Sequence, residues 1–439
     1  PIEIIHPCSL KMPPIIPGIV TGTGTMSFYR GTLSQHPGHA PSVRAFAVLA
    51  GIESISRGIL ISVFPVAMYR IFEDAQRVSE VYFMIGVLSF LVALVVPWIS
   101  RSMPRRWLYS IAVIAYIAAA LICAWSSTWV FALGLAMFTL SGVVVFVCFN
   151  AYIMDYISRV KLGECQALQL FYSGAAWTIG PFLGIWLMTL WKPAPFILSA
   201  GASCLLLVVF WIYRLGDGKA IQRSAGAPPN PFAYLHRFVR QPRLVAGWLF
   251  AVLKSGGWWV YILYLPIYAV ENGHSEQLGG ALLSLSNAFL FLTPLIIKTM
   301  RGRVRLALII GFFCSGSLFL MASIDLAGSS VTITLLVLAS LFMILLDVCA
   351  GLPFLMAVRP SQRTEMSAVY STYRDVSGVL APGAASLVLM FAPLKMLFGL
   401  TAVSFFGCVL VASKLHPRLG VQRFRPLEIE PLPGEATSG

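Results

Sequence analysis

Charged residues are scarce in this sequence. Asp, Glu, Lys and Arg together make up 11% of the 439 residues, whereas soluble proteins contain roughly 25%. Hydrophobic residues make up 58%, against roughly 45–50% in soluble domains. The composition therefore excludes an ordinary soluble domain and predicts a protein that lies in a lipid bilayer.

Residues that hold metals or perform catalysis are few or poorly placed. The six histidines fall outside the long apolar runs, and none of the eight cysteines has the spacing of a metal ligand. The sequence contains no Gly-x-x-x-x-Gly-Lys-Ser/Thr loop for a nucleotide, and no recognisable arrangement of nucleophile, base and orienting group. We therefore expect no enzyme activity, no metal or other cofactor, and no direct use of ATP.

Long apolar runs are abundant. A helix that crosses a bilayer needs about 20 mostly apolar residues, and twelve runs of this kind occur. The predicted fold class is an all-α membrane protein with twelve transmembrane helices. The predicted spans are residues 46–68, 81–99, 107–125, 128–152, 168–190, 194–213, 245–269, 278–297, 304–324, 331–356, 368–390 and 394–413.

Basic residues are distributed unevenly between the loops. One alternate set of loops holds most of the arginines, whereas the other set holds only Arg70, Arg77, Lys192 and Lys395. Because short basic loops stay in the cytoplasm, both termini are predicted to be cytoplasmic, with the protein in a bacterial inner (plasma) membrane. The net charge of +14 then reflects topology and contact with anionic lipid headgroups, and we expect no nucleic-acid binding.

Polar segments divide the chain into parts. Residues 1–43 are rich in Pro, Gly, Ser and Thr and are predicted to form a disordered cytoplasmic tail, and residues 416–439 form a second tail. Two six-helix bundles are predicted at residues 44–213 and 244–415. The linker between them, residues 214–243, contains a short amphipathic stretch that suits a helix lying on the lipid headgroups.

Two stretches about half a chain apart resemble each other. Residues 46–67 read FAVLAGIESISRGILISVFPVA, and residues 250–269 read FAVLKSGGWWVYILYLPIYA. Glu53 corresponds to Lys254 and Pro65 to Pro266 with the same offset. A repeat with a charge at the matching place in each copy predicts two pseudo-symmetric bundles that face a site between them.

The loops after the second and eighth spans are copies of one pattern. The first reads PWISRSMPRR from Pro97, and the second reads PLIIKTMRGR from Pro294. Their closing basic residues resemble the Gly-x-x-x-Asp-Arg-x-Gly-Arg-Arg loop of the major facilitator superfamily, although Arg101 and Lys298 stand where that family has Asp. With the spans and the repeat, the resemblance covers residues 44–415 and implies a secondary active transporter that works by alternating access.

The fifth span contains the motif Gly180-Pro181-x-x-Gly184. It resembles a motif in the fifth helix of superfamily antiporters, which is thought to help hold the periplasmic side shut. A Gly-Pro step also kinks any helix and lets neighbouring helices approach closely, so a purely structural role remains open.

Six charged residues lie well inside the predicted spans, more than two residues from either end. At about 1.5 Å per residue, they fall in one layer roughly 10–15 Å from the cytoplasmic ends of their helices. Because an isolated charge in a bilayer is costly, we expect these groups to pair or to line water. They are Glu53 and Arg57 on one face of the first span, Lys254 in the seventh, Asp347 in the tenth, and Arg374 and Asp375 in the eleventh.

These charges suggest coupling to protons. A carboxyl group that a rocking motion separates from its cation can take up a proton on one side of the membrane and release it on the other. A static ion-pair network that only fixes helix packing is the alternative. The candidates for proton coupling are Glu53, Asp347 and Asp375, and the cations expected to bind an anionic part of the substrate are Arg57, Lys254 and Arg374.

Aromatic residues add candidates for substrate binding. Trp258 and Trp259 fall in the interior of the seventh span, next to two glycines, where they can stack on a cyclic or aromatic substrate. Core packing is the alternative for either side chain. Tyr172 and Tyr373, which correspond to each other in the repeat, are further candidates.

The resemblance also implies a gate. In the superfamily the second and eleventh helices touch across the halves, as do the fifth and eighth. We therefore expect Arg101 to pair with Glu365, and Lys298 with Glu164, when the cytoplasmic side is closed.

The resulting hypothesis is a monomeric transporter for a small organic solute, amphiphilic or anionic, with protons as the coupling ion. The Gly-Pro motif and the aromatic seventh span favour export. The fourth span lacks the Arg that many drug exporters of the superfamily carry, so uptake by proton symport remains an alternative. A membrane assembly or lipid-handling factor that kept the fold without transporting is a third possibility.

Overall fold

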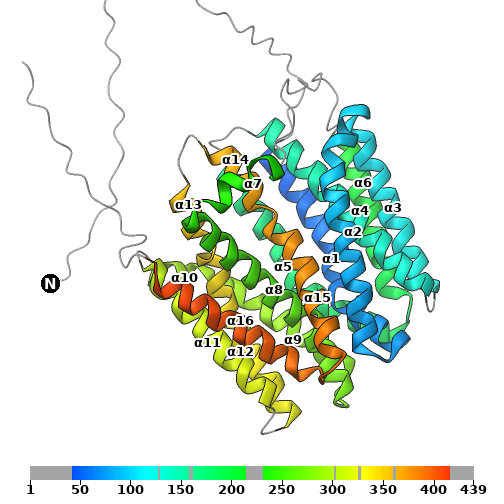
Figure 1. Cartoon of the computed structure of the whole chain (residues 1–439). Helices are drawn as coiled ribbons and strands as arrows, with labels where there is room; N and C mark the ends of the chain where they lie inside the picture. Colours follow the sequence, from blue (N-terminus) through cyan, green and yellow to red (C-terminus); the bar gives the residue numbers. More distant parts are fainter. Residues whose placement is uncertain are drawn as a thin grey trace, which may run out of the picture. The chain divides into compact units, whose positions relative to one another are not determined.

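The computed structural model describes residues 42–126, 129–157, 162–213, 231–300, 303–324, 328–358 and 362–415. All regular elements in these ranges are helices, which confirms the predicted all-α fold (Figure 1). The predicted tails, apart from Ser42 and Val43, and residues 214–230 of the predicted linker lie outside the described residues.

The first half of the chain contains six long helices. Three of them continue through an internal proline, which is Pro65 in the first helix, Pro97 in the second and Pro181 in the fifth. The helices are α1 (Val43–Phe72), α2 (Ala75–Ser102), α3 (Arg105–Trp125), α4 (Trp129–Tyr156), α5 (Leu162–Leu190) and α6 (Ala194–Ile212).

The second half is divided into shorter pieces. A helix of nine residues, α7 (Pro231–Val239), precedes it within the predicted linker. The remaining elements are α8 (Pro242–Glu271), α9 (Glu276–Ala288), the 3₁₀ helix η2 (Phe289–Leu292), α10 (Thr293–Met300), α11 (Val304–Ile324), α12 (Ser329–Cys349), α13 (Leu352–Ala357), α14 (Arg363–Tyr370), α15 (Tyr373–Leu389) and α16 (Lys395–Ser413).

Eleven helical segments in the described residues are long and apolar enough to cross a membrane. The eleventh predicted span, residues 368–390, is the one missing from this set, because it is divided between α14 and α15 and is too short in either piece. Ser371 and Thr372 keep helical backbone angles, but the Thr372 hydroxyl donates to the carbonyl oxygen of Val369 at 2.7 Å and accepts from the Trp248 indole at 3.3 Å. The hydroxyl thereby competes with the helix for that carbonyl.

Prolines explain two other interruptions in the second half. Pro294 has no N–H to donate to the carbonyl of Leu290, and the chain tightens into η2 immediately before it. Pro353 likewise cannot bond to Cys349, and the chain turns at Ala350 and Gly351 between α12 and α13. Sequence analysis had predicted uninterrupted spans at both places.

The two halves repeat one packing pattern. In the first half α3 packs against α4 and α6, and in the second half α11 packs against α12 and α16. Across the halves α2 packs against α15, α5 against α9 and α1 against α8. The contacts of α2 and α5 are the pairings that the family resemblance implied.

The two halves are in closer contact at one end of the helices than at the other. We call the end that carries Val43 of α1 and Arg105 of α3 the basic end, and the end that carries Phe72 of α1 the far end. One apolar core joins residues of both halves, such as Phe64 and Phe196 with Tyr264. At the basic end, a core around Tyr109 in the first half is separate from a core around Phe354 in the second. The halves are therefore packed together at the far end.

Candidate functional site

The first charged pair lies within α1. Arg57 Nη1 donates to Glu53 Oε1 at 3.1 Å, one helical turn away. The guanidinium carbon lies 5.5 Å from the centre of the Trp177 ring on α5, a cation–π distance. The Arg57 side chain keeps 40% of its surface exposed and Glu53 keeps 20%. The pair is thus internal to one half and still open to a ligand.

The second pair joins two helices of the other half. Lys254 Nζ on α8 lies 2.7 Å from Asp347 Oδ1 on α12. The indole nitrogen of Trp258 donates to Asp347 Oδ2 at 3.0 Å, so both carboxylate oxygens have a partner. The structure therefore brings together Lys254 and Asp347, which the sequence placed only in the same layer, and adds Trp258 to them. It gives Trp258 a polar contact that the sequence did not suggest.

The third group of charges lies between the halves. The guanidinium carbon of Arg374 on α15 lies 4.8 Å from the centre of the Phe146 ring on α4, so a cation of the second half contacts a ring of the first. Arg374 is exposed. Its neighbour Asp375 is half-buried and makes no ion pair or hydrogen bond in the described part of the chain.

The remaining aromatic candidates have different surroundings. The Tyr373 ring centre lies 5.9 Å from Lys254 Nζ, which adds it to the second pair. Trp259 packs on α15 at Gly378, where an added Cβ would lie 3.6 Å from the indole. Tyr172 packs on Gly51 and lines an apolar cavity of about 430 Å³ between α1 and α5. Only Tyr373 of these three is therefore in contact with a charged candidate.

The α5 motif lies where three helices meet. A Cβ on Gly184 would overlap the carbonyl oxygen of Ile59, so only glycine permits this approach of α5 to α1. The Pro181 carbonyl accepts a hydrogen bond from Ser62 of α1 at 2.7 Å. A Cβ on Gly280 of α9 would lie 2.8 Å from the same carbonyl oxygen. The motif thus packs α5 against both halves.

Polar contacts between the halves at the far end were not found from the sequence. Arg70 of α1 donates through Nε and Nη2 to the two carboxylate oxygens of Glu276 on α9. The hydroxyls of Ser79 on α2 and Tyr264 on α8 lie 2.6 Å apart. The two members of each pair are about 200 residues apart in sequence, and no local pattern signals either contact.

The predicted cytoplasmic gate stays a prediction. The side chains of Arg101, Glu164 and Glu365 lie outside the described residues. Lys298 on α10 is exposed and makes no ion pair in the described part of the chain. The pairs were predicted for a state in which the cytoplasmic side is closed. In this structure the halves are packed together at the far end.

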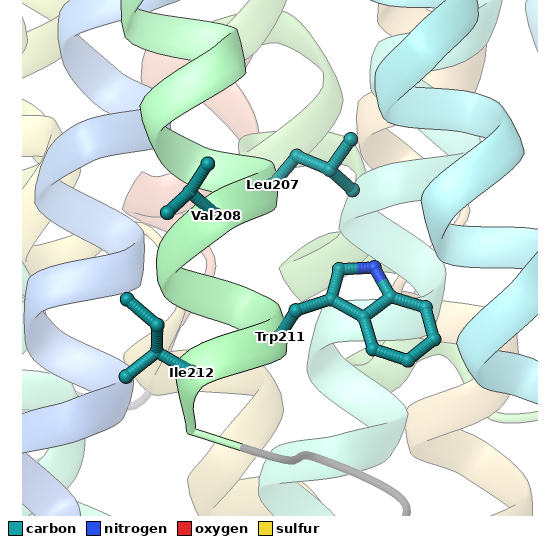
Figure 2. Close-up of a pocket in the computed structure, with 4 residues that line it drawn as sticks. All are labelled: Leu207, Val208, Trp211 and Ile212. Carbon is teal, nitrogen blue, oxygen red and sulfur yellow. The ribbon is translucent and has the colours of Figure 1, made fainter.

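Outside this layer, a surface hollow of about 650 Å³ lies on α6. Figure 2 shows its four lining side chains, Leu207, Val208, Trp211 and Ile212, extending from one helix in two directions. The hollow is lined by apolar side chains and contains no charged group. Among the described residues, no three His, Cys, Asp or Glu side chains are grouped as a metal site would require.

The family follows from a sequence comparison. A sequence model of the Major Facilitator Superfamily matches residues 46–382, more than half of the chain. The chain belongs to the Major Facilitator Superfamily. It is a multi-pass membrane transporter and not an enzyme, as the sequence predicted. No curated protein matches the sequence.

Solved structures of superfamily transporters share the fold. The nucleoside transporter NupG is 14% identical with a TM-score of 0.64, and the match covers 85% of this chain and 99% of that chain. A POT family transporter in complex with 5-aminolevulinic acid is 13% identical with a TM-score of 0.66, covering 84% and 94%. The peptide transporter POT is 14% identical with a TM-score of 0.69, covering 86% and 94%. At these identities the likeness concerns the fold alone.

Proposed function

We propose that this superfamily member exports a small amphiphilic or anionic organic solute in exchange for protons, by alternating access between its two halves. The observation that carries the proposal is the set of charges on α1, α8, α12 and α15. It contains three carboxylates and three cations inside membrane helices, and Arg374 contacts the other half of the protein. Charges at such depth are costly unless they serve transport or pair firmly.

Proton coupling is supported by the different numbers of ion-pair and hydrogen-bond partners that the three carboxylates have. Asp347 has partners on both oxygens, and Glu53 has one ion pair. Asp375 has no ion pair in the described part of the chain, and its helix α15 packs against α2 and α8, so that movement of the halves changes the surroundings of this helix. We therefore propose Asp375 and Glu53 as the proton carriers and the Lys254–Asp347 pair as the more static group.

An anionic substrate is supported by the two arginines. Arg57 and Arg374 come from opposite halves, and each guanidinium lies over an aromatic ring; Arg57 also donates one N–H to Glu53. Such a planar fork binds a carboxylate or phosphate in a bidentate manner. Trp177 and Phe146 would then contact the apolar body of the same solute.

Proton flux driven by a solute gradient tests this function. Purified protein is placed in proteoliposomes that contain a pH-sensitive dye and is offered organic anions, sugars and lipophilic cations. Wild-type protein is expected to move protons with an organic anion, and Glu53→Gln and Asp375→Asn are expected to fall to the level of protein-free liposomes. Solute movement that is unchanged in both variants would contradict proton coupling.

The Arg374→Gln variant tests the anion site. We expect its affinity for the transported anion to fall roughly tenfold to a hundredfold, because a hydrogen bond to a charged group contributes about 1.5–3 kcal/mol. Arg374→Lys keeps the charge but loses the planar guanidinium group. Its affinity should lie between those of wild type and Arg374→Gln. The matched control is Arg77→Gln, an exposed arginine at the far end. Equal affinity in Arg374→Gln and wild type, measured by solute-induced quenching of tryptophan fluorescence, would exclude this role.

Uptake by proton symport is the second candidate. Helix α4 lacks an arginine and places Phe146 opposite Arg374 instead, and similar structures include a transporter named for nucleosides and one named for peptides. The direction of solute movement under an imposed proton gradient separates symport from antiport. A membrane factor that does not transport predicts that neutralising Glu53 and Asp375 leaves function in cells intact.

A further inference from the structure

The linker helix α7 presents three different faces. Tyr234, Phe238 and Gln241 follow one another at intervals of about one turn and face the second half, where Phe238 is 2% exposed. On the next face Leu235 is 42% exposed and Val239 is 60% exposed. The third face is basic, with its residues exposed. It contains His236, and two exposed arginines follow it: Arg240 just after the end of α7 and Arg243 at the start of α8.

The inner face fixes how α7 is oriented. The Phe238 ring centre lies 6.3 Å from that of Phe354 on α13, and Phe238 shares a small apolar core with Met366 of α14. The side chain of Gln241, just after α7, donates to Gln362 Oε1 at 3.4 Å. Because these contacts hold the inner face against α13 and α14, the apolar and basic faces are directed away from the protein.

The position of α7 places those two faces at a membrane boundary. Helix α8 begins at Pro242, three residues after α7 ends, and is one of the candidate membrane spans. A short helix at this place, with an apolar face beside a basic face, has the form of a helix that lies in the lipid interface. Its basic face complements acidic headgroups, and its apolar face suits acyl chains.

We infer that a surface formed by Leu235 and Val239 of α7, with Arg240 and Arg243 just after this helix, binds acidic phospholipid. The occupant is a lipid headgroup with its acyl chains, because a soluble anion would leave the exposed leucine and valine uncovered. The inference does not depend on the transported solute or on proton coupling.

The short helices α13 and α14 connect this surface to the candidate site. Helix α7 packs on α14, which is followed after Ser371 and Thr372 by Arg374 and Asp375 on α15. Helix α13 is likewise separated from the Asp347 helix only by the turn at Ala350 and Gly351. Bound acidic lipid therefore steadies the two short helices that lie next to the charged layer.

Native mass spectrometry of the full chain in neutral detergent tests the binding. Phosphatidylglycerol and phosphatidylcholine are titrated against wild type and an Arg240→Gln/Arg243→Gln variant. Wild type is expected to prefer phosphatidylglycerol, and the variant to lose that preference by about fivefold for each arginine removed. The matched control, Arg77→Gln/Lys192→Gln, removes two charges from the other set of loops and should retain the preference. An unchanged preference in the first variant, or an equal loss in both, would overturn the proposal.

A second variant separates lipid from free anion. Leu235→Gln/Val239→Gln keeps every positive charge and should also weaken phosphatidylglycerol binding, whereas an attraction to charge alone predicts no change. Inorganic phosphate should raise the midpoint of thermal unfolding of wild type much less than phosphatidylglycerol does. An equal rise with both would show a simple anion site. Thermal unfolding of each variant in detergent without added lipid confirms that it is folded.

Discussion

The Asp347→Asn variant is expected to lose on the order of 3 kcal/mol of stability, because it leaves the Lys254 ammonium group without its counter-ion inside a membrane helix. In the wild type the two groups are 2.7 Å apart, with 16% of Lys254 and 29% of Asp347 exposed. Lys254→Met should have a similar cost, since it leaves the carboxylate with only the Trp258 indole. The midpoint of thermal unfolding in detergent measures both effects.

The double variant Lys254→Met/Asp347→Asn distinguishes pairing from transport. Removing both charges should restore most of the stability, because no unpaired charge is left, and the coupling energy of the cycle should approach the sum of the two single costs. Transport should remain lost if the pair also acts in the carrier cycle. The exposed pair of Arg77 and Asp74, 3.7 Å apart, is the matched control, and Arg77→Gln should cost less than about 1 kcal/mol. Additive costs for Lys254 and Asp347 would contradict the pairing.

Adding a methyl group at Gly86 or Gly280 is expected to shift the protein towards the state that is open at the far end. A Cβ on Gly86 of α2 would lie 2.5 Å from the carbonyl oxygen of Gly378 on α15, and one on Gly280 would lie 2.8 Å from that of Pro181. Both carbonyl oxygens belong to the backbone of the other half, so they cannot move away by a change of side-chain rotamer. Overpacking of this kind costs about 1–3 kcal/mol, which the protein avoids by separating its halves there.

Cysteine labelling measures this shift. Val78 on α2 is fully buried at the far end, so Val78→Cys in a chain without other cysteines should react slowly with a membrane-impermeant maleimide. Gly86→Ala and Gly280→Ala should each raise the rate about tenfold, the factor that about 1.4 kcal/mol gives. Gly174→Ala and Gly201→Ala are the controls, because a Cβ at either position meets open space. Lower stability with an unchanged labelling rate would contradict the expected opening.

Much of the fold could be predicted, because the lengths of the apolar runs and the repeat between the two halves can be read directly from the sequence. The pair of Glu53 and Arg57 was predictable as well, since residues four apart share a helical face. Lys254 and Asp347 could be placed at similar depths, but which neighbouring helix faces which depends on packing between distant segments. The indole contact of Trp258 with Asp347 was missed for the same reason.

The interruptions in the second half were missed for a different reason. Pro294 and Pro353 lie inside apolar runs, and prolines in the first half, such as Pro65 and Pro181, are tolerated within continuous helices. Sequence alone therefore did not distinguish a proline that a continuous helix contains from a proline at which the helix is interrupted. At the turn of Ser371 and Thr372, the threonine hydroxyl accepts a hydrogen bond from the Trp248 indole of another helix, a contact that no local pattern reports.

Distances between spin labels at both ends test alternating access most directly. One pair, Lys192→Cys with Asn272→Cys, spans the halves at the far end, and another, Ser102→Cys with Thr299→Cys, spans them at the basic end. All four positions are exposed. Acidic buffer and an added transported anion are expected to lengthen the far-end distance and shorten the basic-end distance within one preparation. If both distances stay fixed, or change in the same direction, while the protein moves solute, the alternating-access account is wrong.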